Sequence, residues 1–492
     1  MNELAYDVSC HDDVMDEGEL DANTPFDGLD LDVRSLTSTT RVPRAVVAVS
    51  SEVQASAVPD EIIDVARDAA DRTGFPRLTC LELFAGPGGL ALGTHKAGFR
   101  HLALIEFEAT AAATLRANCS GPLEMDPGVV RHKDARVVDY TPFAGVVDLL
   151  TAGPPCQPFS AGGHGRGADD ERNMFPALLD VVGTLRPRAV LVENVRGLTR
   201  DKFREYFEYI QARLRFPFHR PGRGEDWRAH YRRLLTVRDT EFADDEQYVV
   251  KTQLVDAADY GVPQHRHRVF IVALRRDLGL EPFYLPPTHN RHALLYDQWI
   301  TGVYWKRHKL APLSYVDPSD ARIVRELRGG LFPLEGRSPW HTVRDAISNL
   351  PESVARGQQK GMANHVQHPG ARAYKGHTGS ALDAPAKALK SGGHGTPGGE
   401  NAIRQADGTI RYVTIREAAR LQTFPDSWRF SGVWGACIKQ LGNAVPVDLA
   451  HLFAKAIHDR LTSVTHVAVL NDRLAPVVIQ KTEAAAMSLP GH

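Results

Sequence analysis

Short apolar runs alternate with helix-like segments from Leu78 to about Arg276, and this alternation constrains the fold more than any other feature. The runs are apolar at successive positions, which is typical of strands that are covered on both faces of a sheet. We therefore expect a doubly wound α/β fold with a largely parallel sheet. The expected strands are 78–84, 101–107, 146–152, 188–194 and 268–274, and the expected helices are 89–98, 109–119, 175–185 and 201–214.

The alternation stops after Arg276 and so divides the chain. The next 129 residues are rich in Pro, Gly, His and Arg without a regular pattern, which indicates a separate, irregular domain. Helical patterns return over 414–424 and 445–461. The predicted division is an acidic, mobile N-terminal extension (1–77), a first domain (78–276), a smaller inserted domain (277–405), a return to the first domain (406–462) and a C-terminal tail (463–492).

Charge is distributed unevenly along the chain. The formal net charge is −2, but residues 1–40 hold eleven acidic residues and one basic residue. The rest of the chain has 57 basic and 49 acidic residues, about +8, which keeps nucleic acid among the candidate partners. The five cysteines form no C-x-x-C pair, and no apolar run approaches the roughly 20 residues of a membrane span. We therefore expect a soluble cytoplasmic protein.

The first expected strand ends in a glycine-rich turn, FAGPGG at 84–89, that leads directly into a helix. Such a turn lets a ligand approach the backbone at the positive end of the helix. The second strand ends in Glu106, where a carboxylate suits the hydroxyl groups of a ribose. We expect a nucleoside cofactor, although an ordinary tight turn would need the same glycines. These residues do not choose between NAD and S-adenosylmethionine.

Cys156 lies in the segment GPPCQPFS, residues 153–160, directly after the expected strand 146–152. A cysteine between prolines, at the start of a long glycine-rich loop, is held stiffly and stays approachable. This setting favours a nucleophile over a core thiol. The other cysteines within apolar patterns, which we expect to be structural, are Cys80, Cys119 and Cys437.

These motifs, with three further ones, resemble those of the DNA (cytosine-5) methyltransferase family. FAGPGG is similar to the cofactor motif of the family and GPPCQPFS to its nucleophile motif. Glu193-Asn194-Val195 resembles the ENV motif, the sequence QHRHR at 264–268 resembles QxRxR, and QLGNAVPV at 440–447 resembles the last motif. The order of the motifs also matches, and the resemblance extends from Leu78 to Leu461.

The resemblance implies a Rossmann-like, S-adenosylmethionine-dependent methyltransferase sheet, with 277–405 inserted as the target-recognition domain. It implies methyl transfer to C5 of a cytosine in a specific duplex DNA sequence. Cys156 would add to C6 as a thiolate, which nearby positive charge should favour. Glu193 would protonate or hydrogen-bond N3. Arg266 and Arg268 would hold the base carbonyl and position the nucleophile loop and phosphates.

The resemblance also implies a cofactor pocket and DNA contacts. The implied cofactor-binding residues are Phe84, Gly86, Gly88, Gly89, Glu106, Asp134, Pro155, Asn443 and Val445. Phe84 would pack on the adenine, the glycines would admit the methionine portion, Glu106 would bind the ribose and Asp134 the adenine amino group. The target base must be flipped out of the duplex, and we expect DNA contacts from Ser160, Arg166 and Gln264.

Several alternatives remain at this stage. The chain could modify RNA, although it lacks the CFT tripeptide of the branch that methylates tRNA, or it could be an inactive DNA-binding regulator. The basic segment 213–238 is either a solvated insertion or an auxiliary phosphate-binding surface. His265 and His267 suggest a metal, but no third ligand cluster supports one. We expect a bacterial, nucleoid-associated monomer of restriction-modification or orphan type, with a cognate restriction endonuclease as a candidate partner.

Overall fold

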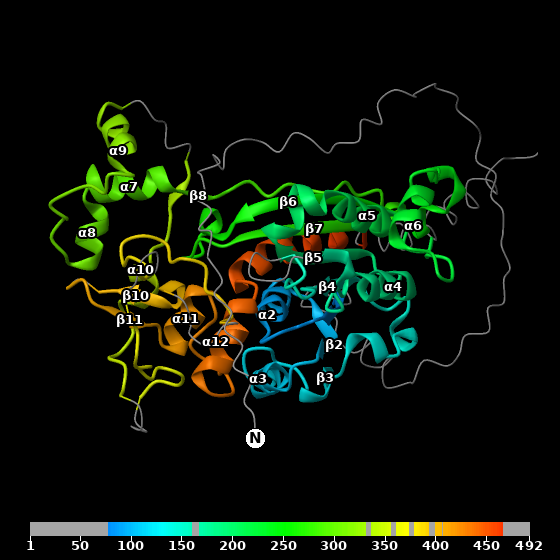
Figure 1. The fold of residues 1–492 in the computed structure, drawn as a ribbon, viewed down its shortest axis with the longest axis horizontal. Helices are drawn as coiled ribbons and strands as arrows, with labels where there is room; N and C mark the ends of the chain where they lie inside the picture. Colours follow the sequence, from blue (N-terminus) through cyan, green and yellow to red (C-terminus); the bar gives the residue numbers. More distant parts are fainter. Residues whose placement is uncertain are drawn as a thin grey trace, which may run out of the picture. The chain divides into compact units, whose positions relative to one another are not determined.

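A computed structural model describes residues 77–159, 167–330, 336–355, 361–372, 378–392, 399–405 and 407–465 (Figure 1). Its centre is a seven-stranded sheet in the order β3-β2-β1-β4-β5-β7-β6. The strands are β1 (Thr79–Leu83), β2 (Arg100–Glu106), β3 (Val130–His132), β4 (Leu149–Ala152), β5 (Ala189–Val195), β6 (Tyr248–Asp256) and β7 (His267–Arg275). The first five run parallel, whereas β7 is antiparallel to both β5 and β6.

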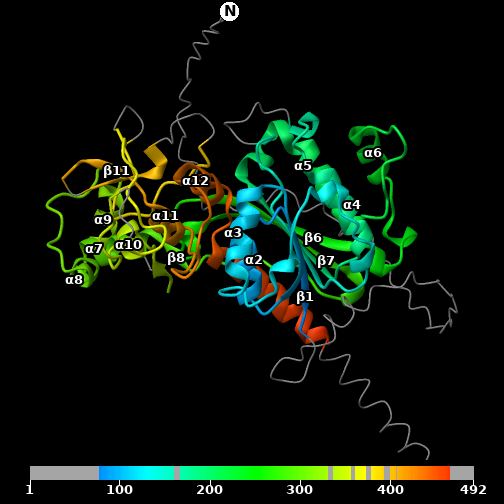
Figure 2. The same cartoon turned by 90° about the horizontal axis from the view of Figure 1, so that it is seen from below.

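Helices cover both faces of this sheet, as the alternation predicts (Figures 1 and 2). One face packs against α2 (Gly89–Lys96), α3 (Ala109–Cys119) and a long helix over 447–465. The other face packs against α4 (Phe175–Leu185) and α5 (Arg204–Arg215). The doubly wound α/β fold is therefore confirmed. Among the described residues, no helix has the length and apolar character needed to cross a membrane.

The strand order reverses beside β1, and this reversal determines where a site can form. β1 pairs with β2 on one side and with β4 on the other. In such sheets ligands bind in the crevice outside the carboxyl ends of the strands at the point of reversal. The glycine-rich turn follows β1 and the Cys156 segment follows β4, so both segments lie at this crevice.

The segment 277–405 contains more regular structure than its composition predicts. It forms β8 (His289–Asn290), α7 (Arg291–Trp299), α8 (Val303–His308), α9 (Ala321–Arg328), β9 (Ser338–Pro339), α10 (Val343–Ile347) and β10 (Ala402–Arg404). Helices α7, α8 and α9 bury apolar side chains in two small clusters of their own. Val343, Leu389 and Ile403 instead share a core with Leu104 of β2. The division into catalytic and recognition domains therefore stays a proposal, because part of the insert shares the core of the sheet.

The chain between and after these parts adds short elements. They are α6 (Trp227–Leu234), β11 (Ile410–Tyr412), α11 (Ile415–Leu421) and α12 (Trp434–Asn443), with 3-10 helices η2 (Ala135–Val137), η5 (Arg196–Thr199) and η9 (Ala257–Tyr260) among the connections. The expected mobile extension, and the expected DNA contacts Ser160 and Arg166, lie outside the described residues.

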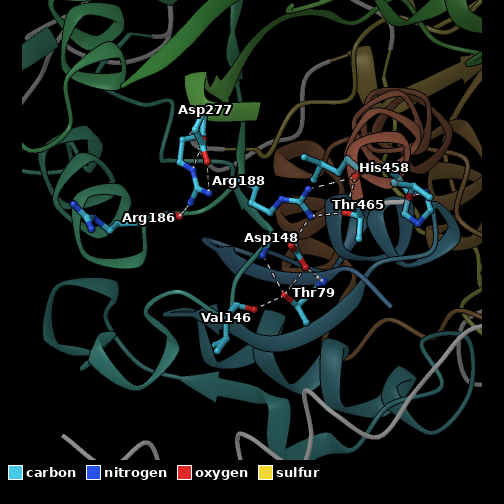
Figure 3. A network of polar contacts seen from close by, with 11 residues as sticks. Thr79, Val146, Asp148, Arg186, Arg188, Asp277, His458 and Thr465 are labelled. Atoms are coloured by element: carbon cyan, nitrogen blue, oxygen red, sulfur yellow. Dashed lines mark hydrogen bonds and ion pairs between the residues drawn. The ribbon is translucent and has the colours of Figure 1, made fainter. Parts of the chain in front are cut away.

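A polar network joins the amino edge of the sheet to the last helix (Figure 3). Arg188, just before β5, donates from Nη1 to Asp148 Oδ1 at 3.2 Å and to Thr465 Oγ1 at 2.9 Å. The other carboxylate oxygen of Asp148 accepts from the Thr79 backbone N–H at 2.8 Å. One arginine therefore links the start of β1, through Asp148, to the C-terminal end of the last helix.

Candidate active site

Three side chains of different chemistry come from neighbouring elements at the carboxyl edge. Cys156 follows β4, Glu193 lies in β5, and Arg268 lies at the start of β7, where it pairs in register with Val195. Arg268 Nε lies 2.7 Å from Glu193 Oε1, and the two side chains are only 12% and 9% exposed. The thiol, the carboxylate and the guanidinium expected from the sequence are thus held by adjoining parts of the sheet.

The described start of the nucleophile loop is fixed to the strand that carries Glu193. Asn194 Nδ2 donates to the Pro154 carbonyl oxygen at 3.1 Å. A Cβ at Gly153 would lie 3.7 Å from Glu193 Oε2, and a Cβ at Gly197 would lie only 2.2 Å from the Phe159 carbonyl oxygen. The chain on both sides of Cys156 is therefore held against the end of β5, by Asn194 at Pro154 and by the close approach of Gly197 to Phe159.

The electrostatic setting of Cys156 combines burial with nearby charges of both signs. The side chain is partly buried, and this burial raises the pKa of the Cys156 thiol. The positive charges of Arg268 and Arg266 oppose this rise in pKa, while the Glu193 charge adds to it. The two arginines thus favour the thiolate, as the sequence predicts, but desolvation of the buried thiol has the larger effect on its pKa.

Arg266 also has a different place from the expected one. Its side chain is buried, and its guanidinium donates to three backbone carbonyl oxygens, those of Leu389 at 3.2 Å, Gly442 at 2.7 Å and Ala444 at 2.8 Å. These bonds connect the start of β7 to the 277–405 segment and to the last motif. Arg266 is a buried connector in this structure, whereas Arg268 faces Glu193.

Gln264 requires a similar correction. It is fully buried, with Nε2 donating to the Leu421 carbonyl oxygen at 3.0 Å and Oε1 accepting from the Leu389 N–H at 2.9 Å. Both ends of the amide are therefore occupied by protein. The prediction that Gln264 contacts DNA is wrong for this conformation, because no part of the side chain reaches the surface.

The turn after β1 is strained where it faces the crevice. Phe84 adopts a positive φ of 57°, which is uncommon for a residue with a side chain, and Gly86 has a φ of 55° with open space where a Cβ would be. Glu106 Oε2 accepts from the Gly86 N–H at 2.7 Å, and Oε1 accepts from the Glu108 N–H at 2.6 Å. Burial raises the pKa of Glu106. The carboxylate thus ties the turn to the end of β2.

The other two glycines of the turn are required by protein packing. A Cβ at Gly88 would lie 2.8 Å from atoms of both Leu115 and Trp428, and a Cβ at Gly89 would lie 2.1 Å from the Val445 carbonyl oxygen. The expected reason for these glycines, access for a ligand, therefore applies to Gly86 alone. Gly89 instead lets the last motif pack against the start of α2.

An aromatic side chain that the sequence analysis missed lies beside Glu106. Phe107 is 67% exposed, although a phenylalanine is normally buried, and it directly follows the buried end of β2. The signal in the sequence is an aromatic residue placed just after Glu106, the carboxylate that we expect to bind a ribose. Exposed Phe107 and open Gly86 leave space and a flat apolar surface, so the residues present fit an adenosine-containing cofactor.

The remaining expected cofactor residues have separate settings. Asp134 caps η2 and forms an ion pair with Arg136 at 2.6 Å, so its carboxylate already has a partner. Pro155 is half-buried next to Cys156. Asn443 is exposed at the end of α12, whereas Val445 is buried against Gly89.

The two histidines of QHRHR share one carboxylate. His265 Nδ1 lies 2.7 Å from Asp256 Oδ2, and His267 Nδ1 lies 3.7 Å from Asp256 Oδ1. In the described part of the chain, no group of three or more His, Cys, Asp and Glu residues is arranged to hold a metal ion.

Four of the eight arginines of the basic segment 213–238 form ion pairs with acidic residues. The pairs are Arg213–Asp180, Arg215–Asp239, Arg228–Glu205 and Arg233–Glu225. Paired cations are less available to phosphates. Because only half of the arginines are paired, both a solvated insertion and an auxiliary phosphate-binding surface remain predictions.

Comparison with known proteins places the chain in one family. It matches the family described as C-5 cytosine-specific DNA methylase over residues 78–216 and 230–459, so only 217–229 interrupts the match. It is 32% identical to Type II methyltransferase M.PspPI of a Psychrobacter strain and 32% identical to M.Eco47II of Escherichia coli, covering in each case 77% of this chain and 78% of the relative. Identity to M.NgoMIV of Neisseria gonorrhoeae is 30%, over 77% of this chain and 97% of the relative. This chain belongs to the C-5 cytosine-specific DNA methylase family.

Proposed function

We propose that Cys156, Glu193 and Arg268 carry out the reaction of this S-adenosylmethionine-dependent DNA (cytosine-5) methyltransferase. The observation that carries the proposal is the 2.7 Å contact between Arg268 and Glu193 beside the Cys156 segment. A thiol, a carboxyl group and a guanidinium in adjoining positions match the three demands of the reaction. The cytosine ring needs a nucleophile at C6, a proton or hydrogen bond at N3, and a positive group at the carbonyl oxygen.

The three side chains act on different atoms of the base. The Cys156 thiolate adds to C6, and the electron pair of the C5–C6 bond becomes available at C5. Glu193 donates a proton or hydrogen bond to N3, which neutralises the charge that the addition places on the ring. Arg268, held by Glu193, donates to the base carbonyl. Bound S-adenosylmethionine supplies an electrophilic methyl group to C5. Transfer of the C5 proton to solvent, departure of Cys156 as a thiolate and return of the N3 proton to Glu193 restore the aromatic ring.

The cofactor is held, in this proposal, by residues on both sides of the turn after β1. Phe107 and Phe84 provide apolar surface for the adenine, and Glu106 accepts hydrogen bonds from the ribose. Gly86 leaves room for the methionine portion. Asp134 would exchange its ion pair with Arg136 for the adenine amino group, and exposed Asn443 would close the pocket from α12.

The remaining parts of the proposal concern DNA. The base is flipped out of a duplex because the C6 face is covered by stacking. Residues 277–405 read the sequence, and Ser160 and Arg166 contact DNA when the loop after Cys156 closes. A cognate restriction endonuclease would act on the same site, and the enzyme would work as a monomer at the nucleoid in the cytoplasm.

Transfer of tritiated methyl groups to unmethylated duplex DNA tests the proposal, with wild type beside Cys156→Ser and a tRNA substrate in parallel. We expect methylation at C5 within one short motif, on DNA only, and its loss in the variant. Transfer that survives in Cys156→Ser would remove Cys156 from the mechanism. Transfer to tRNA alone would replace the substrate by RNA.

A further inference from the structure

Residues 386–391, which we call the strap, lie beside the residues that lead into β7. The His265 N–H donates to the Ala386 carbonyl oxygen at 2.8 Å, and the Ala386 N–H donates to the Pro263 carbonyl oxygen at 3.0 Å. These two bonds form a bridge between Ala386 and Gln264. The strap, although part of the 277–405 segment, is therefore paired with the residues that lead into the strand carrying Arg268.

Two buried side chains of the QHRHR motif form hydrogen bonds to the strap backbone. Gln264 Oε1 accepts from the Leu389 N–H, and Arg266 Nη1 donates to the Leu389 carbonyl oxygen. Leu389 itself is 2% exposed. The N–H and the carbonyl group of Leu389 are thus both hydrogen-bonded by side chains of the QHRHR motif. In the protein interior, leaving either group unpaired would cost free energy.

The rest of the strap backbone is also tethered. The Lys387 N–H donates to Ser380 Oγ at 3.0 Å. Asn401 accepts from the Lys390 N–H and donates to the Lys390 carbonyl oxygen, each at 3.0 Å. A Cβ at Gly442 would lie 2.3 Å from the Ser391 nitrogen, so the strap also packs directly on α12. The strap is a rigid element.

Two lysines on this rigid backbone have exposed side chains that differ in their partners. Lys390 Nζ forms an ion pair with Glu400 Oε1 at 2.7 Å. The Lys387 ammonium has no acidic partner among the residues that the structure describes. Lys387 therefore places an unpaired positive charge on the strap, among the described residues, whereas the charge of Lys390 is neutralised by Glu400.

The strap lies close to the catalytic pair. Arg266 immediately precedes β7 and Arg268 lies at its start, and the Arg266 guanidinium interacts electrostatically with Arg268, Glu193 and Cys156. Arg266 holds the strap, and Arg268 holds Glu193. We propose that the strap is a DNA-contacting element in which Lys387 binds a backbone phosphate near the target cytosine, while Gln264 and Arg266 set the height of the strap above the active site.

This inference rests on the proposed function, because it requires DNA at the active site. A lysine that neutralises one phosphate adds affinity without sequence information and makes binding salt-dependent. The buried motif QHRHR would then act on DNA indirectly. Gln264 and Arg266 are positioning residues for the strap, and Lys387 makes the contact that the sequence analysis assigned to Gln264.

The salt dependence of binding to a mixed-sequence duplex, measured by fluorescence anisotropy from 50 to 200 mM KCl, tests the contact. We expect Lys387→Ala to reduce the slope of log K against log [salt] by about 0.9, the value for one lost phosphate contact, and Lys387→Arg to restore it. The matched control, Lys390→Ala, should leave the slope unchanged. An unchanged slope in Lys387→Ala would overturn the assignment.

A second variant tests the positioning role. Gln264→Leu keeps the approximate volume but removes both hydrogen bonds, so we expect weaker DNA binding with an unchanged salt slope and unchanged affinity for S-adenosylmethionine. Wild-type DNA affinity in this variant would overturn the positioning role, and if Gln264→Leu does not fold, the lysine pair still decides the proposal. Methyl transfer by the wild type on the same DNA separates the two proposals. If the wild type transfers methyl groups but Lys387→Ala leaves the salt slope unchanged, only the proposal for the strap is rejected. If the wild type transfers none, the proposed function is rejected.

Discussion

Arg268 and Glu193 neutralise one another across two antiparallel strands, with Nε 2.7 Å from Oε1. One carboxylate oxygen of Glu193 is therefore already bonded to Arg268 in the absence of a base. In the proposed mechanism a cytosine would share both groups, with N3 at the carboxyl group and the carbonyl oxygen at the guanidinium. The ion pair keeps both side chains in place while the pocket is empty of substrate, which lowers the cost of ordering them during the reaction.

The first prediction concerns the proton at N3. Glu193→Gln keeps the shape of the side chain but cannot deliver a proton, so we expect kcat to fall by about 10²- to 10⁴-fold, the usual size of a general-acid contribution. Single-turnover transfer of tritiated methyl groups measures the effect, with DNA binding as the control for folding. A decrease in kcat of less than tenfold would show that another group protonates N3.

The second prediction follows from the raised pKa of Cys156. Only the thiolate reacts with iodoacetamide, so alkylation of Cys156 in the free protein should increase with pH through values above about 8.5. Arg268→Leu removes the largest opposing positive charge and should shift the curve to still higher pH. Mass spectrometry of the labelled peptide gives the rate, with Cys156→Ser as the blank. A midpoint below pH 7 would contradict the burial argument.

The third prediction concerns Phe107 as the surface for the adenine. Aromatic stacking on a base contributes about 1–3 kcal/mol, so Phe107→Ala should raise KM for S-adenosylmethionine by about 5- to 150-fold and leave kcat nearly unchanged. Val433, which is 78% exposed and lies outside the proposed pocket, provides the control Val433→Ala. An equal effect in both variants would count against a specific adenine contact.

The fourth prediction concerns a buried acid beneath the cofactor turn. Glu82 in β1 accepts from Thr151 Oγ1 at 3.1 Å and lies 3.9 Å from His101 Nε2. Burial raises the pKa of Glu82 to about 8 and lowers the pKa of His101 to about 4. Glu82 in the folded protein therefore keeps a proton that the unfolded chain loses above about pH 4.3.

The sign of the stability change follows from these pKa values. The unfolded chain binds fewer protons at Glu82 from about pH 4.3 to pH 8, so the contribution of Glu82 to stability decreases over that window. His101 opposes the decrease up to about pH 6.5, which leaves a net loss between about pH 6.5 and 8, at most about 1.4 kcal/mol per pH unit. Urea denaturation of wild type and Glu82→Gln at pH 6.5 and 8 measures the free energy of unfolding. We expect the difference between the two pH values to shrink in the variant, and an unchanged difference would contradict a protonated Glu82.

Much of the sheet could be predicted because its strands are apolar on both faces. The expected helices 109–119 and 175–185 coincide with α3 and α4. β6 was missed because it is an edge strand, where Lys251 can be exposed and the apolar pattern is broken. The largely parallel sheet is confirmed, with β1 to β5 parallel, whereas the antiparallel direction of β7 depends on the connection through β6 and not on its own apolar sequence.

The sequence predicted the site residues whose type the chemistry requires. It did not predict the residues whose position depends on packing against distant parts of the chain. Cys156, Glu193 and Arg268 lie at the expected edge. Arg266 was assigned to the base carbonyl and the nucleophile loop, and Gln264 to DNA, because QHRHR resembles the QxRxR motif of the family. Their burial depends on carbonyl and N–H groups of Leu389, Gly442 and Leu421, which come from distant parts of the chain. No local pattern in the sequence predicts those hydrogen-bond partners.

The network around Arg188 has a consequence for how the fold can be connected. Thr79 and Thr465, the two ends of the catalytic fold, are held in one network by Asp148 and Arg188 (Figure 3). Chain ends that lie together can be joined by a linker while the chain is opened elsewhere. Residues 217–229, which the family match does not include, with Arg223 exposed, offer a place for the new ends. A circular permutant that begins at Arg223 would keep every strand of the sheet and every side chain of the active site in its present position.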